Sequence, residues 1–276
     1  MRENRRRAQV VAVTSGKGGV GKTSTSVNLA IALAQRGRNV VLLDADLGLA
    51  NVEVLLGLTS VYNLQHVISG EKRLVEVLVP GPGGIMVVPG SSGLARLADL
   101  GPVARTNILN GLEELQESTD YIIIDTMAGI GQNAVSFCVA ADEVLLVCTP
   151  EPSSIVDAYA MLKTICQMRD DAMLNLVVNM AGSEEQAQAV AGKFSNVSQQ
   201  FLGRPIACIG CILRDQHVSQ AVMQTNPFIL RFPNAPATRC IHELAGKVIY
   251  RRAGIDFRRP SFFKRFAQSL GIASNA

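Results

Sequence analysis

Short apolar runs alternate with longer stretches of helical periodicity along most of the chain. The first unit is the β-branched run Val10–Thr14, followed by a glycine-rich stretch and the helical pattern Ser24–Gln35. Further runs are too short for helices and predict strands at Val40–Leu43, Ile85–Val88, Tyr121–Ile124, Val144–Cys148, Leu174–Val178 and Ile206–Leu213. The clearest helical patterns between them are Pro102–Glu117, Ser153–Met168 and Ala235–Arg252. Because apolar strands alternate with helices, we predict an α/β fold with a mostly parallel twisted sheet and helices on both faces.

Composition, together with the absence of a recognisable signal peptide or membrane span, predicts a cytosolic protein. With 48% hydrophobic and 18% charged residues among 276, the chain does not have the composition of a disordered protein. No apolar run reaches the roughly 18 residues of a membrane-spanning helix. The basic start runs into a strand instead of the apolar core of a signal peptide. We therefore expect a cytoplasmic protein whose six cysteines are reduced.

The net charge of +3 is the sum of two unlike parts. Residues 1–7 and 247–276 together carry 11 basic and 2 acidic side chains, whereas residues 8–246 carry 15 basic and 21 acidic ones. An acidic body with two basic ends does not favour direct, sequence-specific DNA binding. It raises the question of what the two ends contact.

A phosphate-binding loop lies between the first predicted strand and the first predicted helix. Residues 16–23, GKGGVGKT, fit the pattern G-x-x-x-x-G-K-[ST]. Backbone N–H groups of Gly16, Gly18, Gly19, Val20 and Gly21, and of Ser24 at the helix start, are expected to surround phosphate oxygens. Lys22 should reach the β- and γ-phosphates, and the Thr23 hydroxyl should ligate Mg²⁺. The sequence thus predicts ATP and Mg²⁺ as ligands.

Three aspartates follow predicted strands. Asp44 and Asp46 come at the end of the second strand, and Asp125 ends the strand that begins at Tyr121. Ligands of open parallel sheets bind beyond the carboxyl ends of the strands. Carboxylates at these ends suit Mg²⁺ and a positioned water, although any one of them could equally serve as a helix cap or turn residue.

The second lysine of the loop, Lys17, gives the variant KGGVGKT, and with it the sequence resembles the MinD/ParA family of P-loop ATPases. The resemblance implies that Lys17 reaches across a nucleotide-sandwich dimer to the partner's phosphates, as an arginine finger does. It implies water-mediated metal binding by Asp125, γ-phosphate sensing by Gly129, and a second switch at Asp44 and Asp46. Asp46 is the candidate for orienting the attacking water.

The same resemblance suggests the remaining site residues. Asn179 matches the adenine-reading asparagine, and Asp215 lies in a loop near adenine in relatives, with a weaker match. Glu151 matches a stretch at the MinD dimer interface; an ordinary surface acid is the alternative. With Lys17, Lys22 and Asp46 as the catalytic set, the chain is expected to be a slow ATPase until a partner stimulates it.

Several stretches, such as DADLGLANVEVLLGL at residues 44–58 and CTPEPSSIVDAYA at residues 148–160, most resemble the flagellar-number regulators FlhG, FleN and YlxH. This branch implies ATP-dependent homodimers on the inner face of the cell membrane that limit flagellar number or position. Its partners are an FlhF-type GTPase, flagellar switch-ring proteins or an enhancer-binding transcription activator. The start of the chain lacks the activator segment that stimulates the GTPase in some relatives.

A basic segment near Ile255–Pro260 leads into a last short helix, taken to begin at Pro260. Phe262, Phe263, Phe266 and Leu270 fall within about 100° of one another on this helix, and Lys264 and Arg265 fall outside that arc. The pattern is typical of an interfacial membrane helix; packing on its own domain is the alternative. The expected organisation is therefore a basic tail at 1–8, a MinD-like ATPase domain at 9–254, and a linker with a membrane-targeting helix at 255–276.

Three other functions stay open at this stage. A MinD-type division regulator shares the fold, the site and the tail. A ParA-type partition ATPase would need a basic DNA-binding surface. An iron–sulfur carrier would use Cys208 and Cys211, yet residues three apart on a regular strand point to opposite faces, which is poor chelating geometry.

Overall fold

The computed structural model describes residues 7–45, 51–89, 101–255 and 259–271. Within these ranges an eight-stranded sheet runs in the order β3-β4-β2-β5-β1-β6-β7-β8. All neighbouring strands are parallel except the short edge pair β3–β4, so the predicted fold class is confirmed. The strands are β1 (Gln9–Ser15), β2 (Val40–Ala45), β3 (Val79–Pro80), β4 (Met86–Val88), β5 (Tyr121–Ala128), β6 (Glu143–Cys148), β7 (Leu174–Ala181) and β8 (Ala207–Leu213).

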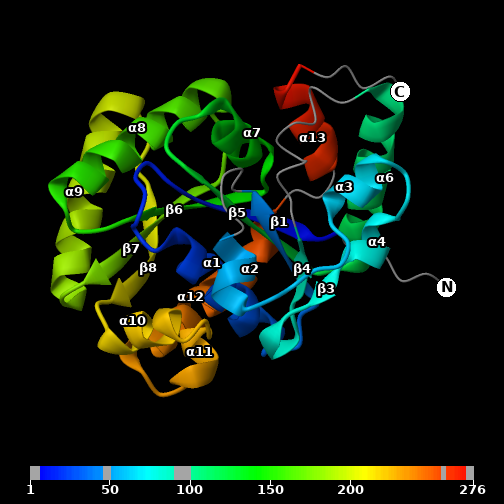
Figure 1. Cartoon of the computed structure of the whole chain (residues 1–276). Helices are drawn as coiled ribbons and strands as arrows, with labels where there is room; N and C mark the ends of the chain where they lie inside the picture. The colour runs from blue at the N-terminus through cyan, green and yellow to red at the C-terminus, as the bar shows by residue number, and fades with distance from the viewer. Residues whose placement is uncertain (1–6, 46–50, 90–100, 256–258, 272–276) are drawn as a thin grey trace.

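Helices cover both faces of the sheet (Figure 1). On one face lie α3 (Leu64–Ile68), α4 (Leu74–Val77), α6 (Pro102–Ser118), α7 (Gln132–Ala140), α8 (Pro152–Met168), α9 (Glu184–Leu202) and α13 (Phe262–Ser269). On the other lie α1 (Lys22–Ala34), α2 (Asn51–Leu56), α10 (Gln216–Met223), α11 (Phe228–Arg231) and α12 (Pro236–Arg251). Two 3₁₀ turns, η1 (Pro82–Gly84) and η3 (Arg252–Gly254), complete the described elements.

The central strand β1 shows how the sequence builds two cores. Val10 and Ala12 are buried in the core beneath α7 and α8, whereas Val11 and Val13 are buried in the core beneath α1 and α12. Because successive side chains of a strand point to opposite faces, a strand between two helical layers must be apolar throughout. This requirement explains the continuous apolar runs of the sequence. None of the helices in the described ranges is long and apolar enough to cross a membrane.

The last helix, α13, packs on the body of the protein beside α6 and α7 (Figure 1). It begins at Phe262, not at Pro260, because the Ser261 hydroxyl caps it by accepting the backbone N–H of Lys264 at 3.3 Å. Phe262, Phe263 and Phe266 are each at most 1% exposed, and the Phe266 ring stacks on the Phe137 ring at 4.3 Å. In this structure the apolar face of the helix therefore lies against α7, with Leu270 packed at the edge of the same core.

Candidate functional site

The phosphate loop joins the end of β1 to the start of α1, as the sequence predicts. Gly21 has a φ of 85°, and an added Cβ would lie 2.2 Å from the Asn179 amide nitrogen, so only glycine fits there. A Cβ at Gly16 would meet the Asp157 carbonyl oxygen of α8 at 2.0 Å. These two glycines fix the loop against β7 and α8, and this packing leaves its remaining backbone free to face a ligand.

Asp125 is the centre of a buried polar cluster beneath the loop. Its carboxylate accepts hydrogen bonds from the hydroxyls of Thr23 at 2.6 Å and Ser26 at 2.9 Å, and the Lys22 ammonium lies at 3.5 Å. The side chain of Asp125 is fully buried, and this burial raises its pKa, whereas Lys22, Thr23 and Ser26 act in the opposite direction. The structure thus brings together Lys22, Thr23 and Asp125, three of the residues that the sequence assigns to phosphate and metal binding.

Lys17 extends away from this cluster toward the start of α8. Its ammonium donates to the Glu151 carboxylate at 2.9 Å and to the Ser153 hydroxyl at 3.0 Å. The hydrogen bond from Lys17 holds the pKa of Glu151 below its usual value. Both side chains of the ion pair remain exposed, at 38% and 61%, so the lysine can leave this position without a large desolvation change.

The two predicted switch segments lie beside the loop. Asp44 is buried opposite Asp125 in the β2–β5 register and accepts the backbone N–H of Val52 at 3.0 Å. Gly129, with a φ of 89°, donates its N–H to the Ser15 carbonyl at 2.8 Å and precedes α7. Asp46, the candidate for orienting water, lies outside the described residues.

A cavity of about 450 Å³ opens over the phosphate loop. It is lined by the loop itself, by Val54 and Leu55 of α2, and by Val222 and Thr225 at the end of α10. The Ser24 hydroxyl, which lines it, is buried and has no hydrogen-bond partner within the described part of the chain. A buried unpaired hydroxyl beside converging backbone N–H groups and a lysine fits a bound phosphate.

A second cavity of about 510 Å³ continues from Gly21 and Ser24 toward β8 and α10. Most of its lining is apolar, from Met180, Ile212, Leu213, Val218, Val222, Met223 and Phe228. Asn179 lies at its base and donates through its amide nitrogen to the Val20 carbonyl at 2.7 Å. This bond fixes the amide so that its oxygen remains as an acceptor, which suits the amino group of adenine.

Asp215 also lines the second cavity, but its carboxylate is already bonded. It accepts the N–H of His217 at 3.0 Å and that of Ala237 at 3.2 Å, and contacts the His217 ring nitrogen at 2.7 Å. Burial alone would raise the pKa of Asp215, yet these hydrogen bonds hold it below the usual value. Asp215 thus caps α10 and ties it to the start of α12 at the edge of this cavity.

Sequence reasoning missed several residues of the site. Val54, Leu55, Met223 and Thr225 line the cavities, and Ser153 binds Lys17, although no motif marks any of them. Two non-glycine residues of the described chain have positive φ, Met180 at 57° and Thr225 at 48°. Each lines one of the two cavities, as strained backbone at ligand sites often does.

The cysteine pair of β8 lies differently from the expectation. Residue Ile209 is an extra residue in the β7–β8 register, which pairs Leu176 with Cys208 and Val177 with Gly210. Because of this irregularity, Cys208 and Cys211 both line one cavity, together with Cys240 of α12. Among the described residues, however, no group of three or more His, Cys, Asp or Glu side chains is arranged to hold a metal ion.

Comparison with known proteins gives a consistent result. A model of the ParA family, described as NUBPL iron-transfer P-loop NTPase, matches residues 6–249. Antiactivator FleN of Pseudomonas aeruginosa is 43% identical over 240 residues, covering 87% of this chain and 86% of FleN. Flagellum site-determining protein YlxH of Helicobacter pylori is 32% identical over 275 residues, covering 98% and 93%. Among solved structures, the MinC:MinD cell division complex of Aquifex aeolicus matches with a TM-score of 0.71 at 29% identity, covering 88% of this chain and 96% of that chain.

Proposed function

Because this chain belongs to the ParA/MinD family of P-loop ATPases, we propose that it is an ATP-switched, dimerising and membrane-associating regulator of flagellar number or position. The observation that carries the proposal is its 43% identity with antiactivator FleN over most of both chains, supported by the flagellum site-determining protein YlxH. The nucleotide site supplies the switch, and α13 supplies the membrane contact.

In the proposed site, Lys22 and the loop N–H groups bind the β- and γ-phosphates, and the second cavity holds adenine against Asn179. Thr23 would hold Mg²⁺ directly and Asp125 would hold it through water, since the hydroxyl and the carboxylate already lie 2.6 Å apart. When bound, Mg²⁺ neutralises charge that develops on the phosphates. Asp46 orients the attacking water, and Asp44 and Gly129 respond to the γ-phosphate.

The partner subunit completes this site. Lys17 leaves Glu151 and Ser153 of its own chain and reaches the phosphates bound by the second copy. The exposed pair it abandons is weak, so the phosphates outcompete it. Hydrolysis removes the γ-phosphate that holds the two copies together, and the dimer separates.

The nucleotide state reaches α13 through α7. This helix begins just after Gly129 and ends at Ala140, whose carbonyl accepts from the Arg265 guanidinium at 2.8 Å. Its Phe137 ring stacks on Phe266, so a shift of α7 disturbs the docking surface directly. Each buried phenylalanine contributes roughly 1.5 to 3 kcal/mol, and a bilayer offers the released helix an equivalent apolar environment.

We propose that the released form binds the anionic inner face of the cell membrane and there meets its partners. These are an FlhF-type GTPase, flagellar switch-ring proteins or an enhancer-binding flagellar transcription activator. A protein held in this way is cytoplasmic and peripheral on the membrane.

Vesicle co-sedimentation tests the molecular part of the proposal. The full chain should bind vesicles of phosphatidylglycerol and phosphatidylcholine with ATP and Mg²⁺, and only weakly with ADP. Deletion of residues 258–276 should abolish this ATP-dependent binding while ATP-dependent dimerisation persists. Unchanged vesicle binding by the truncated protein would refute the role of α13.

Counting flagella tests the cellular part. Deletion of the gene in its own bacterium should change the number or position of flagella, and the wild-type gene should restore them. The match to the MinC:MinD complex makes a division regulator the second candidate, for which the same deletion would produce minicells with normal flagella. Salt-sensitive binding to random duplex DNA would instead favour a partition ATPase.

A further inference from the structure

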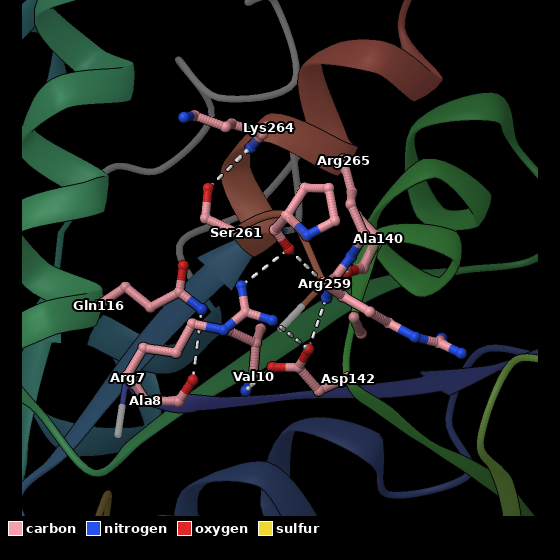
Figure 2. A network of polar contacts seen from close by, with 12 residues as sticks. Arg7, Ala8, Val10, Gln116, Ala140, Asp142, Arg259, Ser261, Lys264 and Arg265 are labelled. Carbon is pink, nitrogen blue, oxygen red and sulfur yellow. Dashed lines mark hydrogen bonds and ion pairs between the residues drawn. The ribbon is translucent and has the colours of Figure 1, made fainter. Parts of the chain in front are cut away.

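Two arginines from opposite ends of the chain converge on one buried carboxylate (Figure 2). The guanidinium of Arg265, on α13, donates to Asp142 at 2.6 Å, and that of Arg7 lies 3.6 Å from the same oxygen. Both arginines also donate to the Pro260 carbonyl, at 2.6 and 2.8 Å. Asp142 is 3% exposed, and its other oxygen accepts the backbone N–H of Val10 at 2.9 Å. The N-terminal segment and α13 thus share a single anionic partner.

The other basic side chains that the structure describes around α13 are paired in the same way. Arg259 forms an ion pair with Asp171, and Lys264 lies 4.0 Å from Glu113, which also accepts from the Ser261 hydroxyl at 3.1 Å. Asp171 is further shared with Arg169 at 2.9 Å. Five basic side chains of this region therefore meet three carboxylates, Glu113, Asp142 and Asp171.

Arg7 is the least satisfied member of this group. Its Nε and one terminal nitrogen are buried and make no hydrogen bond to any residue that the structure describes, although its side chain is 13% exposed. An arginine presents five donors in a planar fork that matches phosphate oxygens. Arg7 is therefore positioned at the base of α13 with donors to spare, and Arg2, Arg5 and Arg6 precede it in the sequence.

We propose that Arg7 and the basic residues of the α13 segment form one surface for lipid phosphates. Glu113, Asp142 and Asp171 act as internal anions that close this surface, because they pair with its basic side chains. The carboxylates pair in the docked state with the same side chains that bind lipid phosphates in the released state. Docking of α13 and membrane binding then exclude each other. This inference rests on the proposed membrane function and adds the N-terminal arginine and the competing carboxylates to it.

The chemistry favours a bilayer over a nucleic acid. The basic side chains border the aromatic residues Phe262, Phe263 and Phe266, which become exposed on release and need an apolar environment. The body between the two ends carries 15 basic and 21 acidic residues and so repels a DNA duplex. Juxtamembrane arginines and lysines each strengthen binding to an anionic surface about fivefold.

Neutralising the competing carboxylates tests the closure. In the full chain with ADP, the double variant Asp171→Asn with Glu113→Gln should bind vesicles of equimolar phosphatidylglycerol and phosphatidylcholine about tenfold tighter than wild type. Its matched control is Asp170→Asn with Glu114→Gln, which changes the net charge equally at exposed neighbours in the same two segments. Asp142→Asn should have the larger effect. Because Asp171 is exposed and Glu113 only half-buried, the double variant keeps the test valid if the buried Asp142 change impairs folding.

A second readout needs no membrane. Amide hydrogen exchange in residues 262–269 should accelerate in the double variant with ADP, and stay at the wild-type rate in the control. Equal vesicle affinity and equal exchange in the double variant and its control would overturn the closure. If wild type itself failed to bind vesicles with ATP, the proposed membrane function would fall first.

Substitution of Arg7 tests the N-terminal half of the surface. With ATP, Arg7→Gln should weaken vesicle binding about fivefold, whereas Arg239→Gln, an exposed arginine of α12 at the far edge of the sheet, should lose markedly less. Equal losses in both variants would remove Arg7 from the surface. Tighter binding of the double carboxylate variant to duplex DNA, without tighter binding to vesicles, would replace the lipid by a nucleic acid and overturn the inference.

Discussion

The Lys17 ammonium lies 2.9 Å from the Glu151 carboxylate of the same chain, although Lys17 belongs to the loop that lines the phosphate cavity. Lys22, only five positions later, points inward to Asp125. The two lysines of one loop therefore have different partners: one is part of the buried cluster, and the other is held at the surface by residues at the start of α8.

Replacement of Lys17 by alanine should abolish ATP-dependent dimerisation. The variant loses the charge that we propose acts on the partner's phosphates, while the exposed ion pair with Glu151 contributes little to stability. Sedimentation with ATP and Mg²⁺ should show a monomer, with an unchanged melting temperature. Lys163→Ala, an exposed lysine of α8, is the matched control and should dimerise normally. A Lys17→Ala protein that sediments like wild type would contradict the proposed role.

Asp125→Asn should uncouple magnesium from nucleotide binding. The neutral side chain keeps its shape and can still accept from Thr23, but it no longer attracts the metal or pairs with Lys22. We expect ATP hydrolysis to fall by about 100-fold or more. Binding of ADP in the presence of EDTA should change little, which serves as the control. Wild-type hydrolysis in this variant would remove Asp125 from the metal site.

Asn179→Ala should reduce the preference for ATP over GTP. The fixed amide oxygen accepts from the adenine amino group in the proposed complex, whereas guanine presents an acceptor at that position. Competition binding should show a loss of about tenfold in selectivity. Asn196→Ala, at an exposed position of α9, should leave the selectivity intact. Equal selectivity in the two variants would argue against base recognition by Asn179.

A buried acid at the opposite end of the sheet makes stability depend on pH. Glu143 is fully buried and accepts from Gln9 at 2.8 Å, Asn175 at 2.6 Å and Arg251 at 3.2 Å. Burial raises its pKa from 4.5 to about 7, although Arg251 and the amides act in the opposite direction. Between pH 4.5 and about 7, Glu143 is therefore protonated in the folded protein and ionised in the unfolded chain.

From this sign, the free energy of unfolding should decrease as the pH rises through this window and level off above it. Glu143→Gln should remove this contribution, which we expect to be roughly 1 to 3 kcal/mol. Denaturant unfolding at several pH values measures it, with Asp170→Asn as a control that leaves the slope unchanged. An identical pH slope in wild type and Glu143→Gln would exclude Glu143 as its source.

Much of the fold follows from local pattern. Every predicted strand is present with ends that differ by a few residues at most, because a sheet covered on both faces demands continuous apolar runs. The family resemblance is also confirmed. It could be seen in the sequence because phosphate binding allows few other residues in the loop from Gly16 to Thr23. Helix α9 also carries readable signals, an N-terminal cap at Ser183 and a left-handed Gly203 at its end.

What the sequence did not reveal depends on contacts between distant segments. Because Ile209 is an extra residue in the β7–β8 pairing, Cys208 and Cys211 line the same cavity. No local sequence pattern predicts such an extra residue. The start of α13 moved to Phe262 because Ser261 caps it. The partners of Lys17, Arg7 and Asn179 come from elements far along the chain, so their identity emerges only when the sheet is assembled. The roles assigned to the individual site residues, from the phosphate loop and Asp125 to the aromatic face of α13, all stay predictions.

The central place of β1 has a consequence for synthesis on the ribosome. This strand is translated before the other strands of the described sheet, yet Val11 pairs with Ile123 of β5 and with Glu143 of β6. Neither neighbour exists until most of the first half of the chain has been made, and loops that long close slowly. The apolar β1 segment therefore stays unpaired while the chain up to β5 and β6 is being synthesised. Chaperones protect exposed apolar segments of this kind during synthesis. Nucleotide can assist folding only after these pairings form, since the phosphate loop packs against β7 and α8, which are translated later still.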